Sequence, residues 1–176
     1  FVREVNEKKI VWKLLSDEDA LKILDEALPD VIANHHDGIL LENERMRATL
    51  FLLVETLRQS VLAITSQIRA GSFTPALTEV RFGHGAPFPP IRLSLPDGSE
   101  ALVGGVIDRV DKANVGGREI LRIVDYKTGG RDFDFAGVLQ GLTLQLPLYL
   151  LAAAERAETR AGLYYMPISQ PVVSDA

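Results

Sequence analysis

The chain contains no cysteine among its 176 residues. This absence excludes disulfide bridges, thiolate nucleophiles, and cysteine-bound zinc or iron–sulfur sites within these residues. The sequence also lacks the roughly 18 uninterrupted apolar residues of a membrane-spanning helix. Its N-terminus does not show the charged, apolar and small-residue order of a signal peptide. We therefore expect a cytoplasmic protein without a membrane segment.

An excess of basic residues is missing as well. The 24 acidic residues outnumber the 19 basic ones and give a net charge of −5, which argues against a protein that coats nucleic acid non-specifically. Residues 61–135 hold equal numbers of both signs, so a phosphate-rich substrate is not excluded there. No phosphate-binding loop of the Gly-x-x-x-x-Gly-Lys-Ser/Thr type occurs, and we expect no ATP to bind this chain.

The apolar pattern predicts an α+β fold. At 47% hydrophobic residues, the chain is long enough to form one sizeable core. The expected elements are helices from Ser16 to about Pro29, from Glu42 to Gly71 and from Val138 to about Arg156, and strands at 77–82, 91–95, 101–110, 119–127 and 162–167. This order favours a mixed sheet over repeated βαβ units. We expect a helical extension over residues 1–41 and one core over residues 42–176.

Two aspartates stand out because they end apolar stretches. Asp108 follows Val106 and Ile107, and Asp125 has the same setting, where a carboxylate is costly unless it is paired or binds a metal. Lys127 is two residues after Asp125, so both side chains leave the same face of a strand. If Asp108 faces that side too, the site fits Mg²⁺ or Mn²⁺ and suits phosphodiester hydrolysis.

The register of the two strands decides whether the aspartates converge. Directly opposed residues of an antiparallel pair share a face. Asp108 and Asp125 therefore share one only if opposed residue numbers sum to an odd value, as when Asp108 opposes Ile123. An even sum would separate them, and the Gly116-Gly117 loop does not determine the register.

A purely structural interpretation remains open for each residue taken alone. Either aspartate could pair with Arg109 or Arg122 instead of a metal. The order of further polar residues favours a site: Glu79 comes one strand earlier, and Gln145 and Tyr149 follow on the next helix. These last two are four residues apart and lie on one helical face, although ordinary packing of helix on sheet would also explain them.

The combination resembles the RecB-like branch of the PD-(D/E)XK nuclease superfamily. The resemblance rests on three runs in order: Gly105-Val-Ile-Asp108, Asp125-Tyr-Lys127 and Gln145-Leu-Pro-Leu-Tyr149. The wider runs specifically resemble the nuclease domain of AddB-type subunits of bacterial ATP-dependent helicase/nucleases: Gly105-Val-Ile-Asp-Arg-Val-Asp111, Val124-Asp-Tyr-Lys-Thr-Gly129 and Leu144-Gln-Leu-Pro-Leu-Tyr149. Three further segments fit the same template: Ser72-Phe-Thr-Pro75, Glu79-Val-Arg-Phe-Gly83 and Leu163-Tyr-Tyr165. The resemblance covers about residues 42–168.

The resemblance implies a restriction-endonuclease-like αβββαβ core within a mixed α/β sandwich. It implies that Asp108, Asp125 and the carbonyl of Tyr126 bind Mg²⁺ or Mn²⁺. Lys127 would be the catalytic lysine. Glu79 matches a recurrent acid of the family and is a further catalytic candidate, holding a metal-bound water or ordering the site.

The resemblance also implies a DNA substrate. Gln145 and Tyr149 would contact or position DNA, and Thr128 would contact a phosphate or shape a turn. The expected function is a metal-dependent exonuclease domain acting on single-stranded DNA, with a helicase/nuclease partner subunit, in double-strand-break repair and recombination. The alternatives are a non-catalytic DNA-end-binding or scaffold module of the same complex and a stand-alone exonuclease.

Two features of the AddB type have no counterpart here. That type holds an iron–sulfur cluster with four cysteines, which this chain does not contain. The branch usually carries a metal-binding histidine on an upstream helix, but His35, His36 and His84 lie in contexts that predict loops. Because the chain begins at Phe1, we expect a piece of a larger subunit with these residues outside it; a lineage without the cluster is the alternative.

Overall fold

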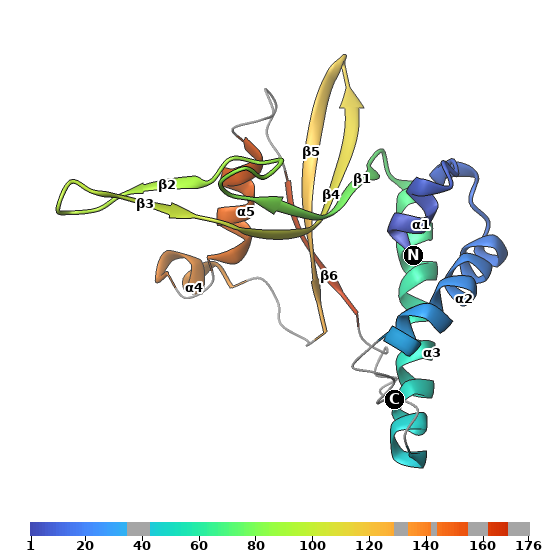
Figure 1. Cartoon of the computed structure of the whole chain (residues 1–176). Coiled ribbons are helices and arrows are strands. Elements are labelled where there is room, and N and C mark those ends of the chain that lie inside the picture. Colours follow the sequence, from blue (N-terminus) through green and yellow to red (C-terminus); the bar gives the residue numbers. More distant parts are fainter. Residues whose placement is uncertain (35–42, 129–133, 142–143, 155–161, 169–176) are drawn as a thin grey trace. The chain divides into compact units, whose positions relative to one another are not determined.

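A computed structural model describes residues 1–34, 43–128, 134–141, 144–154 and 162–168, so His35 and His36 lie outside the described residues (Figure 1). The chain divides into two compact units, Phe1–Gly71 and Ser72–Pro167. The sequence predicted a boundary after residue 41, whereas the structure groups the long helix after it with the N-terminal helices. That residues 42–71 belong to the nuclease domain stays a prediction.

The first unit is helical. Its elements are α1 (Val2–Glu7), the short 3₁₀ helix η1 (Trp12–Leu14), α2 (Asp17–Asn34) and α3 (Glu44–Ala70). Ser16 caps α2 as predicted, since its Oγ accepts a hydrogen bond from the Asp19 amide at 3.0 Å. The expected end at Pro29 was wrong: α2 continues to Asn34 with Pro29 inside it. A proline costs a helix one hydrogen bond and a local clash, but its fixed φ is compatible with the helix.

Helix α3 confirms the predicted long amphipathic helix. The Asn43 side chain caps it by accepting a hydrogen bond from the Met46 amide at 3.0 Å. By length and composition α3 is the one helix of the described residues that could cross a membrane. Glu55 and Arg58 interrupt its apolar stretch, and Arg58 pairs with Asp25 of α2 at 2.6 Å. We therefore interpret α3 as part of the helical unit.

The second unit contains the predicted α+β core. Its elements are β1 (Thr74–Phe82), β2 (Ile91–Ser94), β3 (Glu100–Val103), β4 (Gly105–Val115), β5 (Arg118–Lys127), α4 (Phe135–Leu139), α5 (Gln145–Ala154) and β6 (Gly162–Pro167). Four strands form a mixed sheet in the order β1-β4-β5-β6, in which only β5 and β6 run parallel (Figure 1). The hairpin β2–β3 forms a second, separate sheet.

Two predicted elements are each divided in the structure. The strand expected at 101–110 is β3 and β4, separated at Gly104, where a Cβ atom would lie 3.0 Å from the Phe82 carbonyl oxygen. The helix expected from Val138 is α4 followed by α5. Pro147 lies in the first turn of α5, where a missing backbone N–H breaks no helical hydrogen bond.

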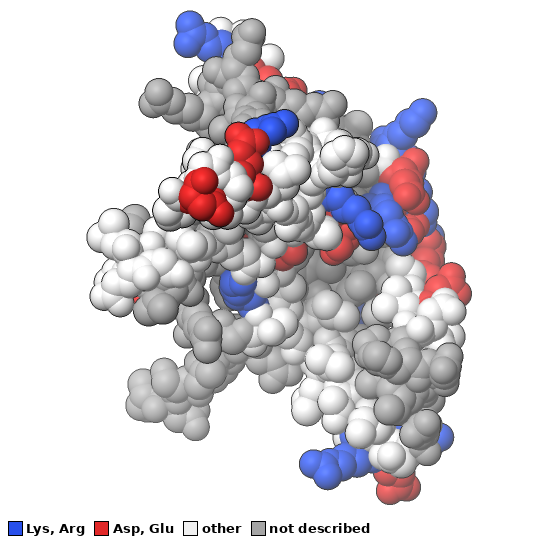
Figure 2. All heavy atoms as spheres, turned by 60° about the vertical axis from the view of Figure 1, so that its left-hand side comes forward, with Lys and Arg blue, Asp and Glu red and all other residues white. Residues whose placement is uncertain are grey.

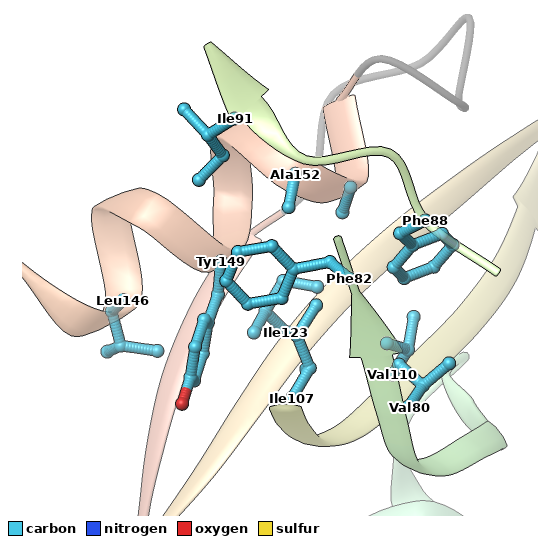
Figure 3. Packing of buried hydrophobic residues seen from close by; sticks show 11 residues of the cluster. Val80, Phe82, Phe88, Ile91, Ile107, Val110, Ile123, Leu146, Tyr149 and Ala152 are labelled. Atoms are coloured by element: carbon cyan, nitrogen blue, oxygen red, sulfur yellow. The ribbon is translucent and has the colours of Figure 1, made fainter. Parts of the chain in front are cut away.

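Helix α5 packs against β5 and β6 and covers one face of the sheet. The buried side chains between them include Val80, Phe82, Ile107, Ile123, Leu146 and Tyr149. Figure 3 shows the Phe82 and Tyr149 rings next to each other, edge to face, with centroids 5.8 Å apart. This packing holds one face of α5 against the sheet and thereby fixes the positions of the polar residues on the same helix.

Candidate active site

Strands β4 and β5 separate at the two predicted aspartates. Their antiparallel pairing runs from Val115 and Arg118 to Arg109 and Val124, and each opposed pair sums to an odd number. The register condition for convergence is thus confirmed. Asp108 is level with Asp125 rather than with Ile123, because the register is offset by two positions from the example given by the sequence. Beyond this point β4 pairs with β1, and β5 pairs with β6. We call this opening between β4 and β5 the fork.

The backbone of Tyr126 faces the fork. Its amide donates a hydrogen bond to Oδ2 of Asp108 at 2.9 Å, where a regular sheet would place a bond to the β4 backbone. In an extended strand the N–H and C=O of one residue point to the same edge, as the paired exchange of antiparallel ladders requires. The Tyr126 carbonyl therefore points toward the fork as well, at the edge that Asp108 faces.

Asp125 is buried and lies against Lys127. Its side chain is 1% exposed, and Lys127 Nζ lies 2.6 Å from its Oδ2. Burial raises the pKa of Asp125 more than the Lys127 contact lowers it, and the nearby charge of Asp108 adds to the rise. Burial disfavours the ammonium form of Lys127, but the Asp125 contact outweighs this, so the pKa of Lys127 is raised. The pair therefore consists of a buried carboxylate and a partly exposed ammonium group in direct contact.

A hydrogen-bonded chain links Lys127 to α5. Lys127 Nζ donates to Oε1 of Gln145 at 2.9 Å, and Nε2 of Gln145 donates to the Tyr149 hydroxyl at 2.8 Å. Figure 3 shows the Tyr149 ring beside Phe82 with its oxygen directed away from the labelled apolar side chains. The structure thus brings the predicted Gln145 and Tyr149 to the predicted lysine.

Tyr165 is a site residue that the sequence reasoning did not assign a role. In the parallel register of β5 and β6 it is the partner of Asp125, and Lys127 Nζ lies 5.4 Å from the centre of its ring. A cation over an aromatic face is attracted by the ring's electrons. The sequence analysis included Tyr165 in the family resemblance but could not place it beside Asp125, since the β5–β6 register depends on the intervening helix and its connections.

Glu79 and Thr128 lie at the margin of the site. Glu79 is exposed, is level with Asp108 in the β1–β4 register, and has a φ of 51°, an unusual backbone for a glutamate. Thr128 is exposed directly after the end of β5. Glu79 does not complete a metal cluster with the two aspartates, because no group of three or more His, Cys, Asp or Glu side chains that could hold a metal ion occurs within the described ranges. The catalytic role of Glu79 and the phosphate contact of Thr128 stay predictions.

The arginines named as structural partners bind elsewhere. Arg109 lies 2.8 Å and Arg122 lies 2.6 Å from carboxylate oxygens of Asp111, on the side of the sheet opposite Asp125. These contacts leave the carboxylates of the fork to other partners. The purely structural explanation of Asp108 and Asp125 is weaker for this reason.

The donors of the fork fit a hard divalent cation. Carboxylate and carbonyl oxygens are the ligands that Mg²⁺ and Mn²⁺ prefer. Oδ2 of Asp125 is buried, and no aligned hydrogen bond to it occurs among the residues described. The Lys127 ammonium, 2.6 Å from this oxygen, already supplies positive charge there, and a divalent cation at the fork would add to it. Acidic and basic side chains lie intermixed on the face that Figure 2 shows, so charge alone does not mark the site.

Comparison with known proteins decides the family. Residues 7–176 match the PD-(D/E)XK nuclease superfamily. The chain belongs to this superfamily. Its mixed α+β fold agrees with the restriction-endonuclease-like core of these enzymes, which are generally dependent on divalent metals. The superfamily predicted from the three runs is therefore confirmed.

The chain is similar to AddB proteins, which are named as subunits of an ATP-dependent helicase/deoxyribonuclease. It is 35% identical over 181 residues to that of Symbiobacterium thermophilum, which covers 98% of this chain and 16% of the relative. It is 34% identical over 169 residues to that of Exiguobacterium sibiricum, covering 92% of the chain and 15% of the relative. The chain thus spans about one sixth of the length of these relatives.

Proposed function

We propose that this chain is a metal-dependent deoxyribonuclease domain that hydrolyses phosphodiesters of single-stranded DNA. The convergence of Asp108, Asp125 and Lys127 at the fork is the observation that carries the proposal. The superfamily, the names of the relatives and the two-carboxylate geometry support it. The ligands of Mg²⁺ or Mn²⁺ would be Asp108, Asp125 and the Tyr126 carbonyl.

Hydrolysis needs a nucleophilic water, an electrophilic phosphorus and relief of charge on the phosphate. A divalent ion, when bound, supplies Lewis acidity for the water and the phosphate oxygens. Lys127 supplies a fixed ammonium that orients the water or donates to a phosphate oxygen as charge builds there. The water oxygen forms the new P–O bond, the bond to the leaving sugar oxygen breaks, and a proton passes to that oxygen.

Gln145 and Tyr149 position Lys127, and Gln145 contacts the DNA. Because Gln145 accepts from Lys127 and donates to Tyr149, it fixes the direction of the ammonium group. Gln145 is also exposed, so a strand at the fork reaches its amide. Affinity for DNA comes mainly from phosphate contacts and falls as salt rises.

We further propose that the domain works within a longer helicase/nuclease subunit in the cytoplasm. The relatives' names and the small share of their length that this chain spans support this setting. A partner subunit and a motor elsewhere in the complex would deliver unwound DNA in double-strand-break repair and recombination. The ATP site would lie outside these residues, since they contain no phosphate-binding loop of the nucleotide-binding type.

The test is degradation of end-labelled single-stranded DNA by the 176-residue chain with Mg²⁺ or Mn²⁺, and with a chelator. Lys127→Met is expected to lower the rate about 100-fold or more, since one preorganised electrostatic contact is worth that much. Lys112→Met is the matched control, because Lys112 is exposed and forms only a loose surface pair with Glu119, at 3.9 Å. Equal rates for both variants would contradict the proposal.

A non-catalytic scaffold is the second candidate. It is favoured by one observation, the Lys127–Asp125 ion pair, which partly neutralises the carboxylate without a metal. In that case the chain would bind labelled DNA ends with the same affinity in chelator as in Mg²⁺ or Mn²⁺, and no cleavage would accompany binding. Metal-stimulated cleavage by the wild-type chain excludes this candidate.

A further inference from the structure

The face of the sheet opposite the fork residues carries a buried ionic cluster made of Arg109, Asp111, Arg122 and Tyr126. Arg109 and Asp111 are both fully buried, with 0% exposure. Charged side chains are rarely buried to this extent, and they are costly unless their partners satisfy them. The cluster contains the Arg-x-Asp sequence that follows Asp108, which the proposed chemistry does not use.

Asp111 holds two guanidinium groups. Its Oδ1 lies 2.8 Å from Arg109 Nε, and its Oδ2 accepts from Arg122 Nη2 at 2.6 Å and from Arg109 Nη2 at 3.2 Å. Arg122 is further packed over the Phe73 ring, 4.6 Å from its centre. A guanidinium engaged through several nitrogens has little freedom to turn. Arg109 is therefore fixed in direction.

Arg109 uses its remaining nitrogen to hold Tyr126. Nη1 donates to the Tyr126 hydroxyl at 2.8 Å. Tyr126 is thus bound at two ends: its phenol is tied to Arg109 on one face of the sheet, and its amide is tied to Asp108 in the fork at 2.9 Å. Beyond Val124, β5 keeps its pairing with β6 on one edge but has no β4 partner on the other, so these two contacts hold Tyr126 on the side that faces the fork.

We propose that Arg109 and Asp111 are positioning residues, which act through the Tyr126 phenol to keep the backbone of Tyr126 aimed into the fork. The Tyr126 carbonyl would then join the Asp108 carboxylate as a ligand of one divalent ion. This inference rests on the proposed metal site. A role in folding alone would also explain the burial, and the two roles differ in what they do to metal affinity.

The test compares two tyrosines on the same face of the sheet. Tyr126→Phe removes the hydroxyl that Arg109 holds and keeps the ring. Tyr164→Phe is the matched control: Tyr164 lies opposite Val124 in the register, its ring is 5.5 Å from the Arg122 guanidinium, and the substitution keeps that ring. Each purified chain is titrated with Mn²⁺ by calorimetry, and its melting temperature is measured in chelator.

Tyr126→Phe is expected to weaken Mn²⁺ binding about 10-fold, the usual effect of losing a group that orients a metal ligand. Tyr164→Phe should bind as the wild type does. Arg109→Lys keeps the charge but not the geometry and should weaken binding at least as much, provided that its melting curve shows a folded chain.

Three results would overturn the inference. If Tyr126→Phe binds Mn²⁺ like the wild type, the cluster has a folding role only, and the proposed function is untouched. If both tyrosine variants weaken binding equally, the effect is general loosening of the sheet. If the wild-type chain itself binds no Mn²⁺, the proposed metal site fails and the inference fails with it.

Discussion

The amide of Tyr126 donates a hydrogen bond to Oδ2 of Asp108 across the fork, at 2.9 Å. Asp108 therefore has two tasks, as the acceptor of a β5 amide and as a proposed metal ligand. The two tasks separate in a pair of substitutions. An asparagine keeps a side-chain oxygen that can accept the amide, whereas an alanine removes both the acceptor and the charge.

Asp108→Ala is expected to destabilise the metal-free chain by about 1–3 kcal/mol, the cost of leaving a half-buried donor without its partner. This corresponds to a fall of roughly 2–4 °C in melting temperature per kcal/mol for a chain of this size. Asp108→Asn should melt near the wild type, yet both variants should lose metal-dependent cleavage. Thermal melts in chelator and DNA cleavage in Mn²⁺ measure the two effects. Equal melting temperatures for Asn and Ala would contradict the double role.

Asp125→Asn is expected to stabilise the metal-free chain at neutral pH. Because the pKa of Asp125 is raised from its ordinary 3.8, its ionised form is disfavoured in the folded chain. The stability that the protonated Asp125 side chain contributes is thus present below about pH 4, and it is lost as the pH rises through the raised pKa of Asp125. The melting temperature of the variant relative to the wild type should climb from about pH 4 to 7. Lys127 titrates far above this window and does not change the sign.

Thermal melts of both chains in chelator across this pH range give the answer. The melting-temperature difference between Asp125→Asn and the wild type could instead stay constant or fall as the pH rises. Either result would show that the Lys127 contact, and not burial, determines the pKa of Asp125. Glu26→Gln is a useful control on an exposed acid, because the pKa of Glu26 is lowered by its contact with Lys8 and its substitution should act in the opposite sense.

Much of this site follows from the sequence, and the reasons differ between its parts. Asp125 and Lys127 share a face because a strand repeats every two residues, and Gln145 and Tyr149 share one because a helix repeats about every 3.6. For the β4–β5 register, the sequence predicted only which registers would bring the two aspartates together. It could not select one of them, since two glycines in the connecting turn fit several registers. Tyr165 was not assigned because its neighbours come from a parallel pairing across a helix. The division at Gly104 depends on how closely the Phe82 backbone approaches, which no local pattern contains.

Gln145→Leu is expected to lower the cleavage rate about 10-fold while leaving Mn²⁺ affinity unchanged. The leucine keeps a similar volume but cannot accept from Lys127 or donate to the Tyr149 hydroxyl, so the ammonium loses its direction. Tyr149→Phe is the graded comparison: it retains the ring against Phe82 and removes only the far end of the chain. Its loss of rate should be smaller. A Gln145→Leu chain that cleaves at the wild-type rate would remove Gln145 from the mechanism.

Gly105→Ala should destabilise the fold by about 1–3 kcal/mol, the range for overpacking a buried site. A Cβ atom at Gly105 would lie 2.7 Å from Cε1 of Phe82, and this ring is 4% exposed and packed on Tyr149. Gly162→Ala is the matched control at another strand residue, since nothing lies within 4 Å of a Cβ there. Urea unfolding of the two variants compares them directly. Equal midpoints would mean that Phe82 moves aside without cost.

Binding of a divalent ion at the fork through Asp108 and Asp125 is tested most directly by calorimetric titration of Mn²⁺ into the 176-residue chain. One saturable site is expected in the wild type and in Lys112→Met, and no such site in Asp125→Ala or Asp108→Asn at the same protein concentration. Saturable binding that survives both aspartate substitutions, or its absence from the wild type, would show that these carboxylates do not hold a metal.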